Sequence, residues 1–546
     1  MDNPTQSAPN QNAVELLEEI QRLMEMKGEN PFKIRAFEKA AGVLAGRDDL
    51  KERAKAGTLT ELPGVGKGIS EVLTEFLLQG KSTVRDELQA SLPPGLLELT
   101  AIPGLGPKKA MQLIEELGIS SAGELEYACR ENRLLKLKGF GEKIQQKILD
   151  GISFMKTTQG QQRLDEAFRC AEMLLPMLTE AAQGLRVSET GELRRRLETV
   201  SKLQFLIEGK EHQGRINDAL EKFRATSRCK IEVEVLRAPK ERFGYELART
   251  TATEAHWKAL GNPEAFDAPT EEAFYEKLGI AFIAPEMRES GEEVKLAKSG
   301  KLQAVLSWNG VRGVFHNHTT RSDGGATLEE MVLAARALGM SYIGISDHSQ
   351  SAFYAQGLKV PDLMAQEKEI RKVQDKYPDI RVFWGIESDI LADGSLDYEP
   401  EVLKKFDFVV ASIHSRFKMD RETMTLRMLE AIRNPCTRFL GHVTGRLLLG
   451  RPGYDIDMER VIAEAAKHDV AIEINSHPAR LDIDWRWGPE LRKCGTRVSI
   501  NPDAHETVGL QDTRYGIAMA RKALLPTSQV VNAGSVNEVE KWLKRL

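Results

Sequence analysis

Three stretches within the first 150 residues repeat one pattern of apolar and polar positions. The stretches "LTELPGVGKGISEVLTEFL", "LTAIPGLGPKKAMQLIEEL" and "LLKLKGFGEKIQQKIL" each place apolar residues before a G-x-G step and an amphipathic run with helical spacing after it. Glycine permits the tight turn that such a step requires. The repeat therefore predicts a helical N-terminal region in which each glycine pair leads into the first turn of a helix.

A different rhythm begins near residue 311, where apolar runs rich in β-formers alternate with helical stretches such as "TLEEMVLAARALGM" and "MERVIAEAAKHD". Repeated β-then-α units predict a parallel sheet or barrel. The candidate strands number seven, which favours a seven-fold over an eight-fold barrel, and they end in "GVFHNH", "YIGISDH", "VFWGIESD", "FVVASIH", "RFLGHVTGR", "AIEINSH" and "RVSINPDAH". Nearly every run ends in a histidine or a carboxylate. Because the C-terminal strand ends of a β/α barrel converge on one face, we expect these side chains to meet there.

Length and composition bound the remaining possibilities. A chain of 546 residues with 41% hydrophobic side chains can bury several cores, so we expect three or more domains. The formal net charge of -5 gives no global basic signature, so any nucleic-acid contact must come from local patches. Five cysteines, an odd number without a CxxC pair, argue against a disulfide framework and a zinc ribbon and predict a reducing cytoplasm. The polar N-terminus and the absence of a long apolar run predict a soluble, unexported protein.

The glycine turns of the N-terminal repeat have the features of phosphate-binding sites. Backbone N–H groups point outward at such a turn and at the helix N-terminus that follows, where they bind anions. A lysine follows within two residues of the second glycine in all three repeats, which suits a phosphodiester backbone and carries no base information. A single G-x-G step is typical of an ordinary helix end, whereas three in register favour DNA binding. The candidate DNA-binding residues are Gly64, Gly66, Lys67, Gly104, Gly106, Lys108, Lys109, Gly139, Gly141 and Lys143.

This pattern resembles helix-hairpin-helix DNA-binding motifs, and the preceding "ENPFKIRAFEKAA" is similar to the opening of the small lyase-like domain of family X DNA polymerases. The resemblance implies that Lys33 and Arg35 contact the DNA backbone, and a solvated helix face is the alternative. It also implies an order of domains. The expected domains are a lyase-like small domain at 1–85, fingers at 86–158, a palm at 159–245 and a thumb at 246–305.

The palm of that family carries a glycine-serine step, an arginine pair, two aspartates one residue apart and a third aspartate on a later strand. Here "TGELRRRLETVSKLQFLI" keeps Gly191, Arg194 and Arg195. The other positions have changed, with Glu192 at the serine, Lys202 and Gln204 at the paired aspartates, and Glu234 at the third aspartate. Two-metal nucleotidyl transfer requires carboxylates that bridge magnesium ions, which an ammonium and an amide cannot do. We therefore expect the palm fold to be kept and the polymerase core to be inactive.

The strand-end motifs H-x-H-x4-D, DH, G-x-E, S-x-H, GH-x-x-GR and D-x-H resemble, in this order, the polymerase and histidinol phosphatase (PHP) domain over residues 311–546. The resemblance places the family's nine metal ligands on His316, His318, Asp323, His348, Glu387, His414, His442, Asp503 and His505. It implies that Asp347 and Asn475 support ligands and that His468 and His477 are not ligands. Imidazole and carboxylate without thiolate suit Mn²⁺, Zn²⁺ or Fe²⁺, and so many ligands favour two or three divalent ions.

Divalent ions in such a cluster acidify water and offset the charge of a phosphoryl oxygen, so the predicted reaction is phosphoester hydrolysis. Arg446 in "GHVTGR" and Arg416, two residues after His414, are the candidate clamps on the substrate's non-bridging oxygens.

The order of domains resembles bacterial family X polymerases over nearly the whole chain. The expected fold is therefore multidomain, with an α-helical helix-hairpin-helix region, an α+β nucleotidyltransferase-like palm and thumb, and a C-terminal α/β distorted (β/α)7 PHP barrel. The resemblance implies a monomeric DNA repair protein of the bacterial cytoplasm, a 3'-5' exonuclease with a further implied activity at abasic sites, which acts on gapped, nicked or 3'-ended DNA and not at membranes. The alternatives are an active polymerase in which Glu198 or Glu208 replaces the lost carboxylates, a non-catalytic DNA-binding scaffold, and a small-molecule phosphatase.

Overall fold

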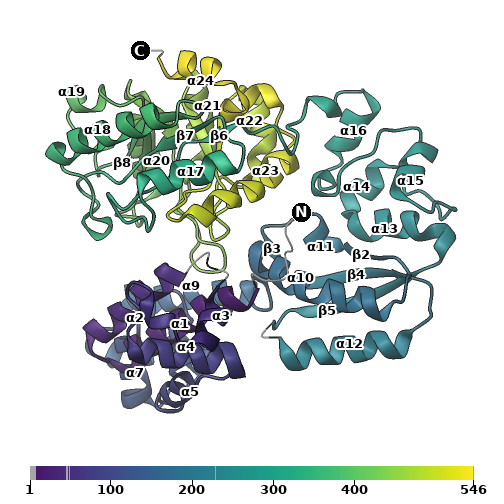
Figure 1. Cartoon of the computed structure of the whole chain (residues 1–546), viewed down its shortest axis with the longest axis horizontal. Coiled ribbons are helices and arrows are strands. Elements are labelled where there is room, and N and C mark those ends of the chain that lie inside the picture. The colour runs from purple at the N-terminus through teal and green to yellow at the C-terminus, as the bar shows by residue number, and fades with distance from the viewer. Residues whose placement is uncertain (1–7, 45–46, 48, 228, 545–546) are drawn as a thin grey trace. The chain divides into compact units, whose positions relative to one another are not determined.

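The computed structural model describes residues 8–44, 47, 49–227 and 229–544, and the chain divides into two compact units between Gln159 and Gly160 (Figure 1). The described part of the first unit is helical throughout, as the sequence pattern predicts. Its helices are α1 (Ala8–Lys27), α2 (Pro31–Leu44), α3 (Leu50–Ala56), α4 (Lys67–Gln79), α5 (Thr83–Ala90), α6 (Leu96–Thr100), α7 (Pro107–Leu117), α8 (Ala122–Arg130) and α9 (Glu142–Thr158).

The three glycine steps of this unit share one backbone geometry. The first glycine of each pair, Gly64, Gly104 and Gly139, has a left-handed φ of 81°, 86° and 87° respectively. Only glycine adopts this conformation without strain. The second glycine of each pair is the N-cap of the helix that follows, which is α4, α7 or α9. The predicted internal repeat is therefore also a repeat of structure.

The second unit begins with a small sheet and its helices, followed by a helical segment. These elements are β1 (Gln162–Arg163), α10 (Leu164–Ala181), β2 (Val187–Thr190), α11 (Gly191–Arg194), β3 (Thr199–Val200), β4 (Lys202–Glu208), α12 (Gln213–Thr226), β5 (Glu232–Ala238), α13 (Phe243–Thr251), α14 (Glu254–Ala259), α15 (Glu271–Lys277) and α16 (Glu292–Lys298). The strand order is β2-β4-β5, with β4 antiparallel to β2 and parallel to β5. Leu203, Phe205 and Ile207 alternate along β4 and are fully buried in the core that also contains α10. Lys202 and Gln204 consequently lie on the opposite face of the sheet.

One disulfide bond joins Cys170 in α10 to Cys229, which precedes β5. The prediction of a chain without disulfides is wrong at this pair. The two cysteines are 59 residues apart, and the packing of α10 against this sheet brings them together. Cys129, Cys436 and Cys494 are free.

The rest of the second unit is a barrel of seven parallel strands in the order β12-β11-β10-β9-β8-β7-β6. Its strands are β6 (Gly313–Val314), β7 (Tyr342–Ile345), β8 (Arg381–Asp389), β9 (Phe408–Ser412), β10 (Thr437–Leu440), β11 (Ala471–Asn475) and β12 (Val498–Asn501). Its helices are α17 (Leu328–Ala337), α18 (Val360–Lys376), α19 (Pro400–Leu403), α20 (Arg421–Arg433), α21 (Met458–Lys467), α22 (Gly488–Cys494), α23 (Thr513–Lys522) and α24 (Val536–Leu543). A bridge between Asn317 and Ala504 nearly closes the barrel, so the predicted seven-fold architecture is confirmed.

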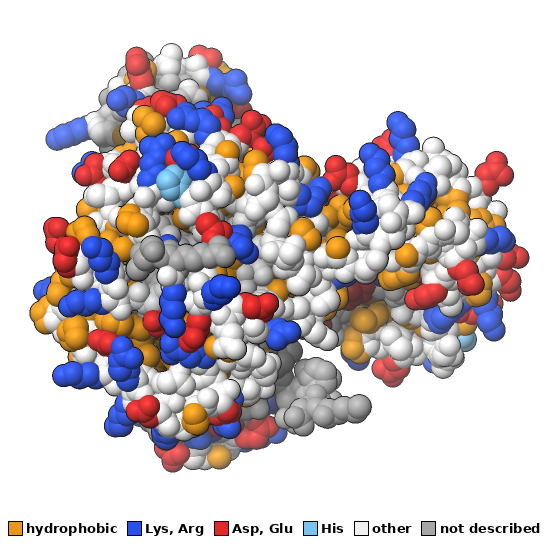
Figure 2. Space-filling view, turned by 90° about the horizontal axis from the view of Figure 1, so that it is seen from above, with side chains coloured by type: hydrophobic (Ala, Val, Ile, Leu, Met, Phe, Trp, Pro, Cys, Tyr) orange, Lys and Arg blue, Asp and Glu red, His pale blue; other side chains and the backbone are white. Residues whose placement is uncertain are grey.

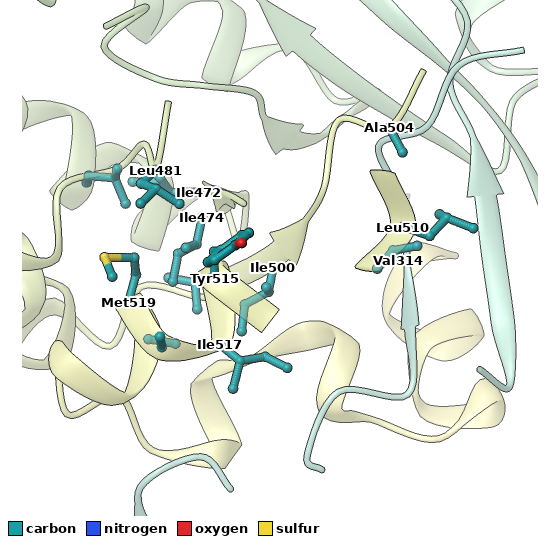
Figure 3. Packing of buried hydrophobic residues seen from close by; sticks show 14 of the residues in the cluster. Val314, Ile472, Ile474, Leu481, Ile500, Ala504, Leu510, Tyr515, Ile517 and Met519 are labelled. Atoms are coloured by element: carbon teal, nitrogen blue, oxygen red, sulfur yellow. The ribbon is translucent and has the colours of Figure 1, made fainter. Parts of the chain in front are cut away.

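Branched aliphatic side chains fill the space between these strands and their helices. Figure 3 shows Ile472 and Ile474 of β11 and Ile500 of β12 packed beside Tyr515 and Met519 of α23. Alternate residues of β11 therefore point to this helix layer, and the residues between them, such as Glu473, point the other way.

Buried charges connect the barrel to the elements before it. Lys522 in α23 is fully buried, and its ammonium donates to the carboxylate of Glu289 and to the carbonyl oxygen of Arg195, both at 2.7 Å. The guanidinium of Arg195 binds the same carboxylate oxygen of Glu289 at 3.1 Å. The two parts of this unit thus share buried ionic contacts as well as one hydrophobic core.

Basic and acidic side chains are interspersed on the face drawn in Figure 2, in keeping with the formal net charge of -5. Among the described helices, none combines the length and apolar character needed to cross a bilayer.

Candidate functional site

The C-terminal ends of the barrel strands bring all nine of the sequence-predicted metal ligands together. His316 and His318 follow β6, His348 follows β7, Glu387 lies in β8, and the remaining ligands follow β9, β10 and β12 or lie in the loop after β6. Three overlapping groups have ligand atoms within 4.8 Å of one another. These groups are His318, Asp323, His348 and His505; His316, His318 and Asp503; and His348, Glu387 and His414.

Glu387 occupies the centre of the cluster. Its Oε1 atom lies 3.1 to 3.2 Å from the Nε2 atoms of three imidazoles, those of His316, His414 and His442. Asp503 Oδ1 lies 3.2 Å from His318 Nε2 and 3.5 Å from His316 Nε2. On the outer side, Asp323 reaches His348 at 3.5 Å and His505 at 3.4 Å. Each carboxylate therefore faces two or more imidazoles, as in a site that shares ligands between ions.

Several ligand atoms are buried and have no hydrogen-bond partner among the described residues. They are His316 Nε2, both ring nitrogens of His318, His442 Nδ1 and Glu387 Oε2. Leaving so many buried polar atoms unsatisfied is costly, because each loses its contact with water. A metal ion supplies the missing partner. The residues present therefore fit a cluster of divalent ions.

The carboxylates and imidazoles of the cluster shift one another's pKa values. Burial favours the neutral form of Glu387, but the surrounding imidazoles, first that of His414, hold its pKa well below the ordinary value. The same opposition of burial and imidazole charge, first that of His316, keeps the pKa of Asp503 low. Burial, and next the charge of His505, lower the pKa of His318 to about 3. Against the effect of burial, the charge of Glu387 raises the pKa of His348 to about 10 and that of His414 to about 9. Neutral imidazole is the form that binds metals, so an ion bound here would displace protons from these two rings.

A second layer of side chains orients the ligands. His316 Nδ1 lies 2.7 Å from Glu473 Oε1, and the backbone N–H of His442 donates to Glu473 Oε2 at 2.7 Å. His414 Nδ1 lies 2.6 Å from Asp389 Oδ1. Such partners fix the tautomer and the direction of a metal-binding imidazole. Sequence reasoning missed both acids, although each stands two residues from a singled-out position on the same strand, Glu473 from Asn475 and Asp389 from Glu387.

The four residues set apart from the ligands form hydrogen bonds or ion pairs of their own. Asn475 donates from Nδ2 to Asp503 Oδ2 at 3.1 Å. Asp347 accepts hydrogen bonds from Thr319 and Ser322, and so it holds the loop between His318 and Asp323. His468 pairs with Glu464 at the end of α21, and the ring of His477 accepts from the backbone of Ala479.

The two predicted phosphate clamps differ in their surroundings. Arg446 donates to Asp484 Oδ2 at 2.6 Å, to the carbonyl oxygen of Arg480 at 2.9 Å and to that of Leu481. These contacts engage its guanidinium, so the geometry argues against Arg446 as a clamp. Arg416 has a left-handed φ of 57° in an exposed turn, and its side chain forms no hydrogen bond or ion pair with another described residue.

The four changed palm positions lie on one face of the small sheet and contact one another or their neighbours. Lys202 Nζ and Gln204 Nε2 each lie 2.7 Å from Glu234 Oε2, across the parallel register of β4 and β5. The hydrogen bond from Lys202 lowers the pKa of Glu234. Glu192 instead accepts from the backbone N–H and the hydroxyl of Ser201, both at 2.7 Å. An internal cation therefore binds Glu234, the acid predicted to stand at the family's third aspartate position.

The arginines of the same motif are also engaged. Arg194 donates to Glu271 and to the hydroxyl of Thr251, both at 2.9 Å. Arg195 donates to Glu289 at 3.1 Å and to the carbonyl oxygen of Thr251 at 2.7 Å.

In the N-terminal unit, most of the predicted DNA contacts are exposed. Lys67, Lys108 and Lys143 stand in the first turns of α4, α7 and α9, each beside the glycine that caps its helix. Lys109 is half-buried and lies over the ring of Phe140. Lys33 and Arg35 are exposed on α2, where Lys33 lies 3.8 Å from Glu29.

Comparison with known proteins supports the predicted families of the N-terminal and C-terminal regions of the chain. Residues 8–82 match the helix-hairpin-helix domain family, residues 96–153 the SAM-like helix-hairpin-helix tandem family, and residues 315–477 the PHP domain family. The DNA polymerase/3'-5' exonuclease PolX of Bacillus subtilis (strain 168) is 33% identical over 97% of this chain and 99% of its own length. A probable phosphatase of Caldanaerobacter subterraneus subsp. tengcongensis is 28% identical over 42% of this chain and 89% of its own length. For a probable phosphatase of Caldicellulosiruptor saccharolyticus the corresponding values are 35%, 41% and 93%. Because the similarity to PolX extends over almost the entire length of both proteins, the chain belongs to the PolX family of family X DNA polymerases with helix-hairpin-helix motifs and a C-terminal PHP domain.

Proposed function

We propose that this protein is a metal-dependent phosphodiesterase that degrades DNA from 3' ends in the bacterial cytoplasm, that it takes part in DNA repair, and that its polymerase core is inactive. The observation that carries the proposal is the convergence of nine side chains on one face of the barrel, eight of them in groups that could hold a metal ion and His442 against Glu387. The PolX relative of Bacillus subtilis is named as a 3'-5' exonuclease as well as a polymerase, which supports the same polarity here. Cleavage at abasic sites is a second activity that we propose for this site.

Some barrel residues would bind the metal ions, and others would orient the binding side chains. His318, Asp323, His348 and His505 would hold one ion, and the groups around Asp503 and around Glu387 would hold one or two more, of Mn²⁺, Zn²⁺ or Fe²⁺. Ions held there would acidify water and offset charge on a phosphate oxygen. Glu473 and Asp389 hold the imidazoles of His316 and His414 in the orientation that binding requires.

The palm geometry supports the loss of polymerase activity. The ammonium of Lys202 lies against Glu234, so a magnesium ion would have to displace an ion pair and bind without two of the three family carboxylates. The proposed substitutes are engaged elsewhere. Glu198 binds Trp485 and Arg486, and Glu208 binds Arg186. Glu208 also stands six residues along β4 from Lys202, a distance of about 20 Å in a strand.

A nuclease assay tests the catalytic half of the proposal. End-labelled gapped, nicked and abasic DNA is incubated with the Mn²⁺-loaded protein, its Asp503→Asn variant and its Asp379→Asn variant. Asp503→Asn removes a ligand charge and keeps the shape, so cleavage should fall at least 100-fold while DNA affinity stays unchanged. Asp379 is an exposed aspartate just before β8, at the opposite end of the barrel, and its variant should cleave normally. Equal cleavage by both variants would exclude the barrel site, and hydrolysis of phosphomonoesters alone would favour the phosphatase alternative.

Primer extension with dNTPs tests the other half. The unmodified protein should add no nucleotide, and the variant with aspartate at 202, 204 and 234 and serine at 192 measures whether carboxylates alone restore synthesis. Metal-dependent extension that survives Asp503→Asn would show that the palm is active.

We further propose that the three hairpins hold DNA through its phosphates, and that the protein does so as a monomer. Charge reversal at Lys67, Lys108 and Lys143 should weaken DNA binding regardless of sequence and reduce the slope of log affinity against log salt by about one for each phosphate that the variant no longer binds. The matched control reverses Lys51, Lys55 and Lys81, which are exposed in the same unit outside the hairpins. Equal weakening in both triple variants would indicate non-specific attraction rather than hairpin binding.

A further inference from the structure

Arg480 is an arginine at the edge of the metal-ligand cluster that sequence motifs do not single out. It follows β11 and lies between the ends of β10 and β12, where its Nε atom is 3.5 Å from Asp503 Oδ2. The other oxygen of Asp503 faces His316 and His318. The guanidinium therefore stands directly beside the ligands.

The donors of this guanidinium are not used within the protein. At 3.5 Å the contact with Asp503 is too long for a strong hydrogen bond, and the side chain of Arg480 donates none to any other described residue. The side chain is 21% exposed, so its remaining N–H groups are open to a ligand. By contrast, the neighbouring Arg451 donates to Gly445, and Arg427 donates to three backbone carbonyl oxygens.

Arg446 holds the loop that presents Arg480. Its guanidinium donates to the backbone carbonyl oxygens of Arg480 and Leu481 and to the carboxylate of Asp484. Leu481 has a left-handed φ of 42°, which a leucine keeps only where its surroundings hold it. Arg446, which the sequence predicts as a phosphate clamp, thus holds the backbone at Arg480 and at the residue that follows it.

We propose that Arg480 binds a non-bridging oxygen of the scissile phosphate and that Arg446 is the positioning residue that fixes the Arg480 backbone. The assignment rests on the proposed phosphodiesterase function. A guanidinium binds phosphate through a planar pair of donors, and here it would do so next to ions that bind the other oxygens. Asp503 would bind ions through one carboxylate oxygen. Its other oxygen would attract the Arg480 guanidinium to the edge of the cluster and leave the donors of that guanidinium available to the phosphate.

The test uses the full-length Mn²⁺-loaded protein and inorganic phosphate as the probe. Calorimetry measures phosphate affinity for the wild type and for Arg480→Ala, Arg480→Lys and Arg446→Lys, and elemental analysis measures metal content. Loss of a hydrogen bond to a charged group predicts a phosphate affinity about 10- to 100-fold weaker in Arg480→Ala, with metal content unchanged. Arg480→Lys should recover only part of this affinity, because it keeps the charge and not the fork. Arg371→Ala, on the exposed face of α18, is the matched control.

Chemical rescue separates the two arginines. Free guanidinium should restore phosphate binding and DNA cleavage to Arg480→Ala, where it can fill the vacated space, and should not restore Arg446→Ala, whose role is to hold a backbone. The assignment is overturned if Arg480→Ala binds phosphate as the wild type does, or if its weaker phosphate binding follows a loss of metal. Phosphate binding does not require cleavage. A wild type that binds phosphate through Arg480 without cleaving DNA would refute the proposed function alone, and normal phosphate binding by Arg480→Ala in an active nuclease would refute this inference alone.

Discussion

Glu473→Gln should show whether Glu473 contributes to metal binding beyond its contribution to the stability of the fold. Glu473 is fully buried and accepts four hydrogen bonds, from the ring of His316, the backbone N–H of His442, and the side chains of Asn475 and Asn501. Glutamine has the same shape but a single acceptor oxygen, and its amide group would face donors. The variant therefore cannot keep both the hydrogen bond to His316 and the hydrogen bond to His442.

The magnitude follows from the number and burial of these hydrogen bonds. Replacing an outer partner of a metal-binding histidine lowers metal affinity about 10- to 100-fold, which equals about 1.4 to 2.7 kcal/mol. Removing one partner of a buried ionic pair also destabilises a protein by about 3 to 5 kcal/mol. Both effects are expected here, so a stability measurement alone would not distinguish them.

A second buried pair of the same chemistry provides the control. His256 Nδ1 lies 2.7 Å from Glu293 Oε1, both side chains are fully buried, and neither is near the barrel ligands. Glu293→Gln should therefore lose comparable stability and keep its metal. The assay is Mn²⁺ and Zn²⁺ content after dialysis against a graded chelator, with urea unfolding of each apo protein. Equal metal retention by the two variants would refute the support role of Glu473.

Three further predictions concern stability and chemistry away from the metal ligands. Burial, and in addition the charge of Asp165, raise the pKa of Asp512 from 3.8 to about 7. The stability that protonated Asp512 contributes is therefore fully present below pH 3.8 and is lost as the pH rises through 7. Asp512→Asn should therefore gain stability relative to the wild type between pH 5 and 8 in urea unfolding, by at most about 4 kcal/mol, and a constant difference would contradict this reasoning. Thiol labelling of the denatured, unreduced protein should modify Cys129, Cys436 and Cys494 and spare Cys170 and Cys229, with labelling of all five as the contrary result. Gly104→Val should lower thermal stability and DNA affinity together, because φ is 86° and a new Cβ would meet the side chain of Lys147, whereas Gly106→Ala, with nothing near its Cβ, should be mild in a melting and binding comparison.

Prediction from the sequence is most successful where the position of a side chain is set by a regular, repeated backbone structure. The seven-stranded barrel could be predicted because each apolar run ends at the same face, and a ligand at a strand end needs no further information to be placed. The hairpin glycines could be predicted for a similar reason, since a left-handed turn before a helix requires glycine three times over.

Residues whose role depends on irregular backbone could not be placed in this way. Arg446 stands in a strand-end motif, yet the loop after β11 folds back and takes up its donors, while Arg480 reaches the ligands from that loop. Glu473 does leave a signal, an acid between two buried isoleucines on a strand, because a buried charge needs a partner. Cys170 and Cys229 leave no such signal in the sequence, because their disulfide bond depends on how one helix packs on one sheet.

The contact of Lys522, Glu289 and Arg195 bears on why the chain would keep its palm even with the proposed loss of polymerase activity. Arg195 belongs to the palm motif, Glu289 to the segment after it and Lys522 to the barrel, and the three meet away from water. A barrel separated from the first 305 residues would lose both acceptors of the Lys522 ammonium and also the partner of Arg521, which binds Glu286. The barrel and the domain before it therefore stabilise each other. If the palm is inactive, as proposed, selection for the barrel would by itself favour keeping the palm fold.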